Sequence, residues 1–178
     1  MKGETMELVL NEHTYDAVMN RIVPEARRFL WIFTADVKDL FVDGGGGRFV
    51  PFLQVLADKL NEGVEVRLVH AKEPGPRFRE DFDRFPEFVQ SDLFERILCP
   101  RMHMKAVIAD ARLAYIGSAN LTGAGMGAKS DTRRNFEAGF ITEDKEHIRG
   151  LMAFMDQFFV GDFCEKCKRR ELCPEPIR

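Results

Sequence analysis

The sequence lacks any long apolar run near its N-terminus. The longest such run there, residues 29–33 (FLWIF), is far shorter than the roughly 20 residues that a membrane-spanning helix requires. The first ten residues, MKGETMELVL, include three charged side chains and no apolar core of the kind found in secretory signals. We therefore expect a cytoplasmic protein, although a chain trimmed of a leading anchor would give the same pattern.

The sequence also lacks a strong excess of charge of one sign. Its net charge is -3 over 178 residues, with 45% hydrophobic and 31% charged residues, as in ordinary soluble domains. This balance gives no overall attraction to nucleic acid or anionic membranes, so a polyanion site would have to be locally basic. Three basic clusters could flank a polyanion backbone or be simple solvated charge: Arg27-Arg28, Arg133-Arg134, and Lys166 with Lys168-Arg169-Arg170.

The pattern of apolar residues predicts an α/β fold with a mixed β-sheet flanked by helices. Helices alternate with strands in the first half of the chain, and strands cluster later. We expect a catalytic domain over residues 1–160 and a Cys-rich C-terminal tail over residues 161–178. The predicted helices span residues 13–28, 51–63 and 143–159, and the predicted strands span 29–36, 64–70, 103–109, 113–119 and 135–142, with a Gly-rich loop over 121–134.

Polar residues gather on the predicted hairpin that spans residues 103–120. His103 and Lys105 share one face of the first strand, and Ser118 and Asn120 share one face of the second. If residues 109 and 114 pair across a turn near Asp110, Lys105 lies opposite Ser118 and His103 lies opposite Asn120. A hairpin that only packs a core has no need of this polar face.

These residue types suit the chemistry of a phosphate group. Ammonium, hydroxyl and amide groups donate hydrogen bonds to phosphate oxygens. A carboxylate, here that of Glu137 on the following strand, can fix the tautomer of a histidine and raise its basicity. A histidine held in this way next to a bound phosphate is a candidate nucleophile. The pattern therefore indicates phosphoryl transfer without a metal or another catalytic cofactor.

The spacing His103-x-Lys105-x4-Asp110-x6-Gly117-Ser118-x-Asn120 matches the HKD motif of the phospholipase D superfamily. Residues 135–139, NFEAG, resemble the segment that supplies that family's histidine-orienting carboxylate. The resemblance implies a phospholipase D-like α/β sandwich and a phosphodiesterase. It also implies these roles: His103 forms a phosphohistidine, Lys105 and Asn120 hold the phosphate with help from Ser118, Glu137 orients His103, and Asp110 near the turn is mainly structural.

The chain departs from the long members of this family in having one HKD motif instead of two. The other histidines, His13, His70 and His147, lie in no similar context. The small single-motif members that the chain resembles use a two-fold homodimer, in which each subunit supplies one motif. The resemblance therefore implies a homodimer in which a second histidine protonates the leaving oxygen and then activates water.

Three of the four cysteines lie in the last 15 residues, in the pattern Cys164-x2-Cys167-x5-Cys173. Cys99, four residues before His103, can complete a set of four thiolates. Structural zinc fits the Cys-x2-Cys spacing, and the whole arrangement also resembles the iron–sulfur staple of some helicase-associated nucleases. The remaining alternative is four free cysteines. A bound metal would pin the tail to the loop before the catalytic strand.

The motif predicts the reaction and leaves the substrate open. A nuclease is favoured by the small size, the single motif and the basic clusters, so nucleic acid is the expected partner. A phospholipase or phosphatidyltransferase would act on membrane lipid and would need an exposed apolar docking surface, for which Phe158, Phe159 and Phe163 are candidates. The third alternative is a non-catalytic nucleic-acid-binding or regulatory module on the same fold.

Overall fold

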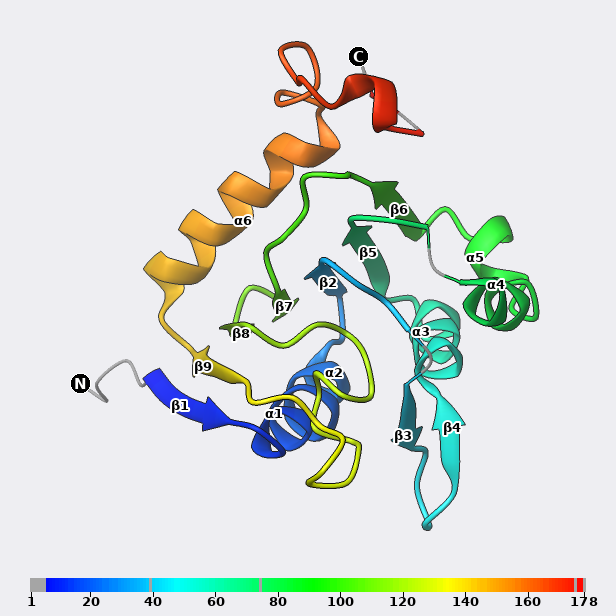
Figure 1. Ribbon diagram of the computed structural model, residues 1–178, viewed down its shortest axis with the longest axis vertical. Helices are drawn as coiled ribbons and strands as arrows, with labels where there is room; N and C mark the ends of the chain where they lie inside the picture. The colour runs from blue at the N-terminus through cyan, green and yellow to red at the C-terminus, as the bar shows by residue number, and fades with distance from the viewer. Residues whose placement is uncertain (1–5, 39, 74, 175, 178) are drawn as a thin grey trace.

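A mixed β-sheet forms the centre of the computed structural model, which describes residues 6–38, 40–73, 75–174 and 176–177 (Figure 1). Its seven described strands lie in the order β1-β9-β8-β7-β2-β5-β6. β5 pairs in parallel with both β2 and β6, while the pairs β2·β7, β7·β8, β8·β9 and β9·β1 are antiparallel. The strands are β1 (Met6–Leu10), β2 (Phe29–Thr34), β5 (Glu65–His70), β6 (Phe94–Leu98), β7 (Ala106–Ala109), β8 (Leu113–Gly117) and β9 (Ala138–Thr142).

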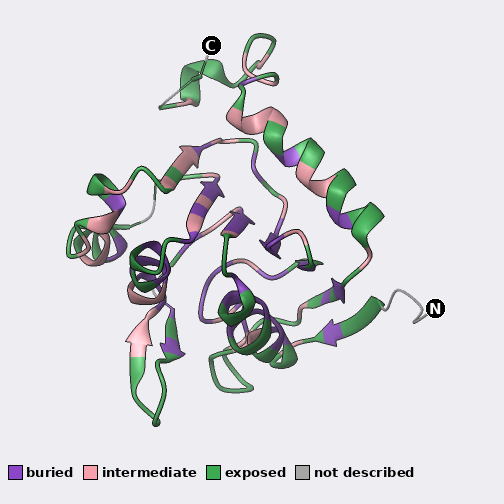
Figure 2. Ribbon diagram, turned by 180° about the vertical axis from the view of Figure 1, so that it is seen from behind, coloured by how far each residue is buried: buried purple, intermediate pink, exposed green. Residues whose placement is uncertain are grey.

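Helices cover both faces of this sheet, which confirms the predicted fold class. One face packs against the helical segment His13–Glu25 and against α3 (Phe52–Asn61), and the other packs against α6 (Lys145–Phe159). Alternation along β2 explains the two cores, because Leu30 and Ile32 belong to one and Trp31 and Phe33 to the other. Figure 2 shows the burial concentrated on the central strands. Among the described helices, none is long and apolar enough to span a membrane.

The remaining elements lie around this framework. The segment His13–Glu25 consists of α1 (His13–Tyr15), the π-helical stretch η1 (Asp16–Ile22) and α2 (Val23–Glu25). β3 and β4 form a separate two-stranded ribbon. The other bounds are β3 (Phe41–Asp43), β4 (Phe49–Pro51), α4 (Pro76–Phe82), α5 (Glu87–Gln90) and the 3₁₀ turn η2 (Arg170–Leu172).

The predicted register of the β7–β8 hairpin is wrong by one residue. Ala109 pairs with Leu113, not with residue 114. The reason lies in the turn, where Asp110 and Ala111 both have a φ of 54° and the N–H group of Arg112 donates to the Ala109 carbonyl at 3.0 Å. Two consecutive residues with positive φ close the hairpin more tightly than the predicted loop.

The ladder of this hairpin is also shorter than predicted. β7 begins at Ala106 and β8 ends at Gly117, so His103, Lys105, Ser118 and Asn120 lie in the segments just beyond the strands. Because β7 is antiparallel to both β2 and β8, and β9 is antiparallel to β8, these segments leave the sheet at one edge. The site residues therefore meet at this edge by topology, and not by alternation along paired strands.

Candidate active site

His103 and Lys105 contact each other at the sheet edge. His103 is exposed and Lys105 is buried, and the Lys105 Nζ atom lies 3.2 Å from His103 Nδ1 and donates to the His103 carbonyl at 2.8 Å. Burial lowers the pKa of Lys105, while the carboxylate of Glu137 acts in the opposite direction. Because an ammonium group only donates, Nδ1 is the acceptor in this contact, which corresponds to the imidazole tautomer with its proton on Nε2.

Ser118 and Glu137 form a second group at this edge. The Ser118 hydroxyl donates to Glu137 Oε2 and accepts from the Ala138 N–H group at 3.1 Å. The amide of Asn135 donates to Glu137 Oε1 at 3.0 Å. In the described residues, the carboxylate of Glu137 is therefore bonded to Ser118 and Asn135, and the imidazole of His103 faces Lys105. The orientation of His103 by Glu137 stays a prediction.

Asn120 connects the site to the end of β2. Its Oδ1 atom accepts the backbone N–H groups of Ala35 and Asp36, each at 3.2 Å, and the hydroxyl of Thr34 lies at 3.4 Å. Two backbone donors identify this atom as the amide oxygen, so the amide nitrogen is the end that can donate to a phosphate. Thr34 in turn adjoins Lys105, because Phe33 pairs with Ala106.

A buried tyrosine next to two glycines sets the backbone path into Ser118, a feature that the sequence analysis missed. Gly117 and Gly139 are paired across β8 and β9, and the Tyr115 ring occupies the space where both would carry a side chain. A Cβ atom on Gly117 would lie 2.6 Å from Tyr115 Cζ and 2.8 Å from the Ala138 carbonyl oxygen. The glycine before Ser118 is thus required by packing.

Asp110 lies at the opposite end of β7, away from His103. Its carboxylate accepts the backbone N–H groups of Arg27 at 3.0 Å, Arg28 at 2.8 Å and Phe29 at 3.0 Å. Burial acts to raise the pKa of Asp110, but the three N–H groups and the charge of Arg28 leave it below its ordinary value. The contacts are those of a residue that holds the start of β2, and its position does not support grouping it with the predicted catalytic residues.

None of the chain's other three histidines, all of which the structure describes, is hydrogen-bonded to the site. His70 is buried at the end of β5, where burial and then Arg96 lower its pKa to about 4. Its Nδ1 atom lies 2.9 Å from the Lys72 carbonyl, and its Nε2 atom accepts from Arg96 Nε at 2.8 Å. His13 is exposed on α1, and His147 pairs with Asp144 at 2.7 Å at the start of α6. His103 is therefore the histidine that this chain supplies to the site.

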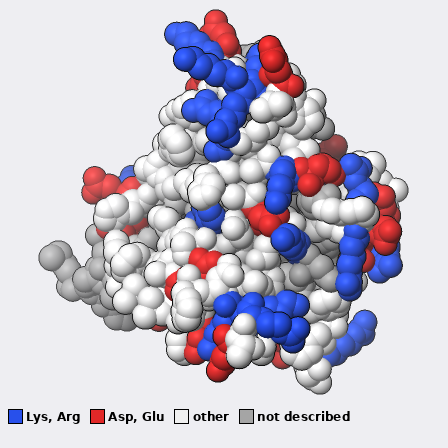
Figure 3. Space-filling view, viewed as in Figure 1, with Lys and Arg blue, Asp and Glu red and all other residues white. Residues whose placement is uncertain are grey.

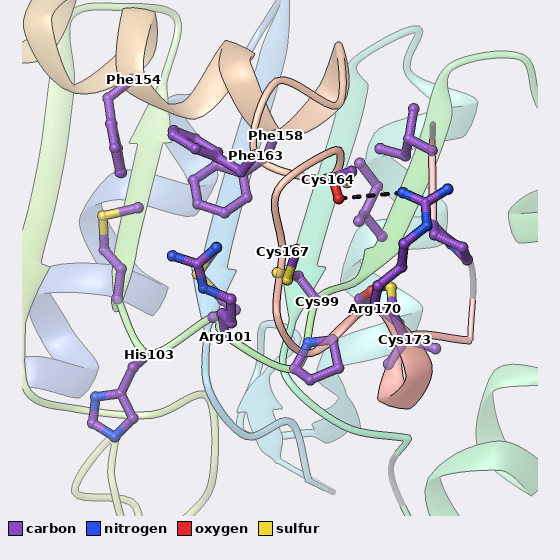
Figure 4. Close-up of a pocket in the computed structure, with 17 residues that line it drawn as sticks. Cys99, Arg101, His103, Phe154, Phe158, Phe163, Cys164, Cys167, Arg170 and Cys173 are labelled. Carbon is purple, nitrogen blue, oxygen red and sulfur yellow. Dashed lines mark hydrogen bonds between the residues drawn. The ribbon is translucent and has the colours of Figure 1, made fainter.

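The four cysteines face one cavity beside the segment that carries His103, although Cys99 lies far from the other three in the sequence (Figure 4). The cavity has a volume of about 370 Å³, and its lining also includes His103. Burial raises the pKa of the Cys99 thiol, and the nearby Cys173, Cys164 and Cys167 add to this shift. All four are free thiols. Among the described residues, no three His, Cys, Asp or Glu side chains lie close enough to hold a single metal ion.

The three basic clusters predicted from the sequence lie at different distances from the edge of the sheet that carries His103 and Lys105. Arg28 lies at the far end of β7, where its guanidinium donates to the Asp110 carbonyl at 3.1 Å. Figure 3 shows lysine and arginine side chains over the loop that joins β8 to β9 and, separately, over the C-terminal tail. In the loop, Lys129 and Arg133 are exposed, while Arg134 pairs with Glu12 at 3.2 Å and Asp131 at 3.0 Å. The positive charge is therefore confined to separate patches, as expected for a chain whose net charge is close to zero.

Residues 23–159 match a family model described as a cardiolipin synthase, PLD-like domain. Among solved structures, NucT from Helicobacter pylori is 14% identical with a TM-score of 0.63, over 86% of this chain and 94% of that one. Nuc from Salmonella typhimurium, a phospholipase D family member, is 13% identical with a TM-score of 0.59, over 86% and 93%. Phosphatidylserine synthase from Haemophilus influenzae Rd KW20 is 12% identical with a TM-score of 0.58, over 89% and 39%. No curated protein matches the sequence. At these identities, likeness to the solved structures shows a shared fold.

Proposed function

Because the chain belongs to the phospholipase D-like family, we propose that it is a metal-independent phosphodiesterase that cleaves nucleic acid through a phosphohistidine. The observation that carries the proposal is the contact between an exposed imidazole, His103, and a buried ammonium, Lys105. The first group is accessible to a substrate, and the second is a partly desolvated charge that a phosphate can neutralise.

Phosphate binding prepares the nucleophile in this proposal. The ammonium of Lys105 and the amide nitrogen of Asn120 donate to the phosphate oxygens, so Lys105 no longer donates to Nδ1 of His103. Nδ1 can then carry the proton and donate to a carboxylate, for which Glu137 is the candidate. The proton leaves Nε2, and the lone pair needed for attack becomes available there.

The reaction then proceeds in two displacements at phosphorus. In the first, His103 Nε2 forms a bond to phosphorus, the bond from phosphorus to the leaving oxygen breaks, and that oxygen takes a proton from a second, protonated histidine. In the second, water attacks phosphorus while the same histidine, now neutral, accepts the water proton. The N–P bond breaks and both imidazoles return to their starting states.

We propose that the second histidine is His103 of another copy of this chain. An exposed apolar row borders the site, formed by Leu8, Phe140 and Ile116, which lie next to one another across β1, β9 and β8. Phe136, beside Glu137, is 95% exposed. Large apolar side chains in this position favour burial against another protein surface. A second copy is the occupant that would also complete the catalytic pair.

Two observations support nucleic acid as the substrate. The chain corresponds to more than nine-tenths of the length of NucT and Nuc, but to 39% of phosphatidylserine synthase. The exposed Lys129 and Arg133 lie in the loop that leads into Glu137, where they can contact a polyanion backbone. A lipid phosphodiester is the second candidate, favoured by the apolar lining of the cavity beside His103 and by the name of the matching family model.

The test is cleavage of labelled single- and double-stranded DNA and RNA in excess EDTA, with phosphatidylglycerol vesicles assayed in parallel. We expect cleavage by wild type, loss of at least about 10³-fold in His103→Ala, and no change in His13→Ala, a matched exposed histidine. A labelled adduct on alkali-quenched wild type, absent in His103→Ala, would identify the phosphohistidine. Lipid cleavage alone would refute the nucleic acid substrate, and full activity in His103→Ala would refute the mechanism. Binding without cleavage of any substrate would favour a non-catalytic module.

Mixing subunits tests the shared site. Inactive His103→Ala chains, added in excess to wild type and exchanged by dilution, should lower activity per wild-type chain because mixed dimers lack one of the two histidines. Ultracentrifugation should show a dimer. A monomer with full activity would refute the two-fold site without affecting the assignment of His103.

A further inference from the structure

The C-terminal tail is held in place by very few side chains. Among residues 162–174, all described, only Phe163, Cys164, Cys167 and Cys173 are half-buried, and every other side chain is exposed. Within residues 162–174, the longest regular element is the three-residue η2. One phenylalanine buries too little apolar area to order a segment of this length against its conformational entropy. The three inward-facing cysteines therefore need another source of stabilisation.

The tail is seated on the segment that leads to His103. The Cys173 thiol donates to the Leu98 carbonyl at 3.7 Å, and the guanidinium of Arg169 donates to the Pro100 carbonyl at 3.1 Å. Cys99 lies between these two acceptors and is fixed to β5, since its N–H group donates to the His70 carbonyl at 2.8 Å. Figure 4 shows the thiols of Cys99 and Cys167 close together on the cavity side of this contact.

Hydrogen-bond donors and positively charged side chains lie next to the sulfur atoms. Cys99 is hydrogen-bonded by the N–H group of Arg101, and Cys167 by the N–H group of Arg169, two residues along the chain in each case. The Arg101 side chain also reaches Cys167, and the guanidinium of Arg170 donates to the Cys164 carbonyl at 3.2 Å. Donors in these positions are of the kind that orient the ligands of a metal site from its outer shell.

The cavity that the four thiols line favours a cluster over a single ion. Zinc holds its sulfur ligands about 2.3 Å from one centre, but no three of the described His, Cys, Asp or Glu side chains lie close enough together for that. The four thiols instead line one cavity of about 370 Å³, whose lining also includes Met102, Phe158 and Phe163. An iron–sulfur cluster presents separate irons to separate cysteines and is commonly shielded by such apolar groups.

We propose that Cys99, Cys164, Cys167 and Cys173 bind an iron–sulfur cluster that pins the C-terminal tail to the segment carrying His103. Each thiol loses its proton when it binds iron, and the cluster links two segments more than 60 residues apart. The cluster does not take part in the reaction at His103. Its role is to hold residues 99–103, between β6 and β7, in a fixed path.

The experiment begins with the full chain purified without oxygen. We expect iron and acid-labile sulfide in about equal amounts, up to about four of each per chain, with the visible absorption of a cluster. Each Cys→Ser variant should lose most of the iron, whereas Glu165→Gln, an exposed substitution between two of the cysteines, should keep it. One zinc per chain without sulfide would refute the cluster, and protein without metal or with disulfides would refute the site.

Tail mobility gives a readout that is independent of activity. Trypsin should cut at Lys166 and Lys168 much faster, by about tenfold or more, in the Cys→Ser variants and in wild type stripped by oxidation and a chelator. Hydrogen exchange over residues 99–103 should rise in the same samples. Stripped wild type covers the case in which a variant fails to fold. A tail that stays protected after complete loss of iron would overturn the pinning role, whatever the outcome of the nuclease assay.

Discussion

Replacing Asp110 should destabilise the protein without removing activity from the molecules that remain folded. Its carboxylate satisfies three backbone N–H groups at the start of β2. These donors are part-buried, and each one left without an acceptor costs about 1 kcal/mol, the low end of the range for a buried group, so Asp110→Ala should lose about 3 kcal/mol. For a chain of this length, that corresponds to a fall in Tm of roughly 6–12 °C.

The asparagine variant refines this prediction. Arg28 and Phe29 donate to Oδ1 and only Arg27 donates to Oδ2, so an amide oxygen in the Oδ1 position keeps two of the three bonds. Asp110→Asn should therefore lose about a third to a half as much stability as Asp110→Ala. Asp58→Ala should change little, because exposed Asp58 accepts one bond, from Gln54 at 3.0 Å.

Acid titration supplies a further check on Asp110. Its pKa is lower in the folded state than in the unfolded state, so its contribution is present above the unfolded pKa and is lost as the pH falls through the folded pKa. Asp110→Asn should lack this acid-dependent part of the unfolding free energy. Denaturant melts and cleavage per folded molecule measure both effects. A folded Asp110→Ala protein that is inactive at wild-type stability would refute the structural role.

Two more predictions concern buried groups near the site. Gly117→Ala should lower the stability by about 1–3 kcal/mol and should also lower the activity, because the new Cβ atom overlaps Tyr115. The control Gly150→Ala has free space on α6 and should be neutral or slightly stabilising. Thermal melts of the two variants test this, and equal Tm values would contradict the packing argument. His70 is neutral in the fold with a pKa of about 4, against about 6.5 when unfolded. Since the unfolded chain binds the proton first, the contribution of His70 to stability should fall as the pH drops from about 6.5 to about 4 and should be constant outside that window. In His70→Gln this pH dependence should be weaker. Urea melts at pH 7 and pH 5 measure it, and a difference in unfolding free energy between the two pH values as large as that of wild type would contradict the prediction.

The sequence predicted the fold class and the central elements because these bury continuous apolar faces. β2 and β5 are short apolar runs, and α3 and α6 have clear helical spacing, so their predicted bounds differ from the observed ones by at most two residues. β1 and β6 were not predicted. Both are edge strands, and Leu8 and Leu10 of β1 are exposed apolar residues, so the alternation that marks a half-buried strand is weak there.

The site residues could be named from the sequence, but their contacts could not. The motif spacing brought out His103, Lys105, Ser118 and Asn120, and all four leave the sheet at one edge. Their arrangement depends on a tight turn and on short segments outside the ladder, for which period-two alternation has no meaning. For this reason the predicted cross-strand pairs failed although the residues still lie at one edge. The contact between Lys105 and His103 Nδ1 could not be predicted for the same reason, because it depends on the conformation of the chain between these two residues, outside the strand.

The contact of Lys105 with His103 has a consequence for how the proposed enzyme is controlled. With an ammonium donor at Nδ1, the Nε2 atom of His103 carries the proton and is a poor nucleophile. Glu137, the candidate orienting carboxylate, is meanwhile bonded to Ser118 and Asn135. A phosphate that draws Lys105 to its own oxygens removes the donor from Nδ1 and so allows the reactive tautomer. The nucleophile would then form only when a substrate phosphate is bound, which protects an exposed histidine from other electrophiles.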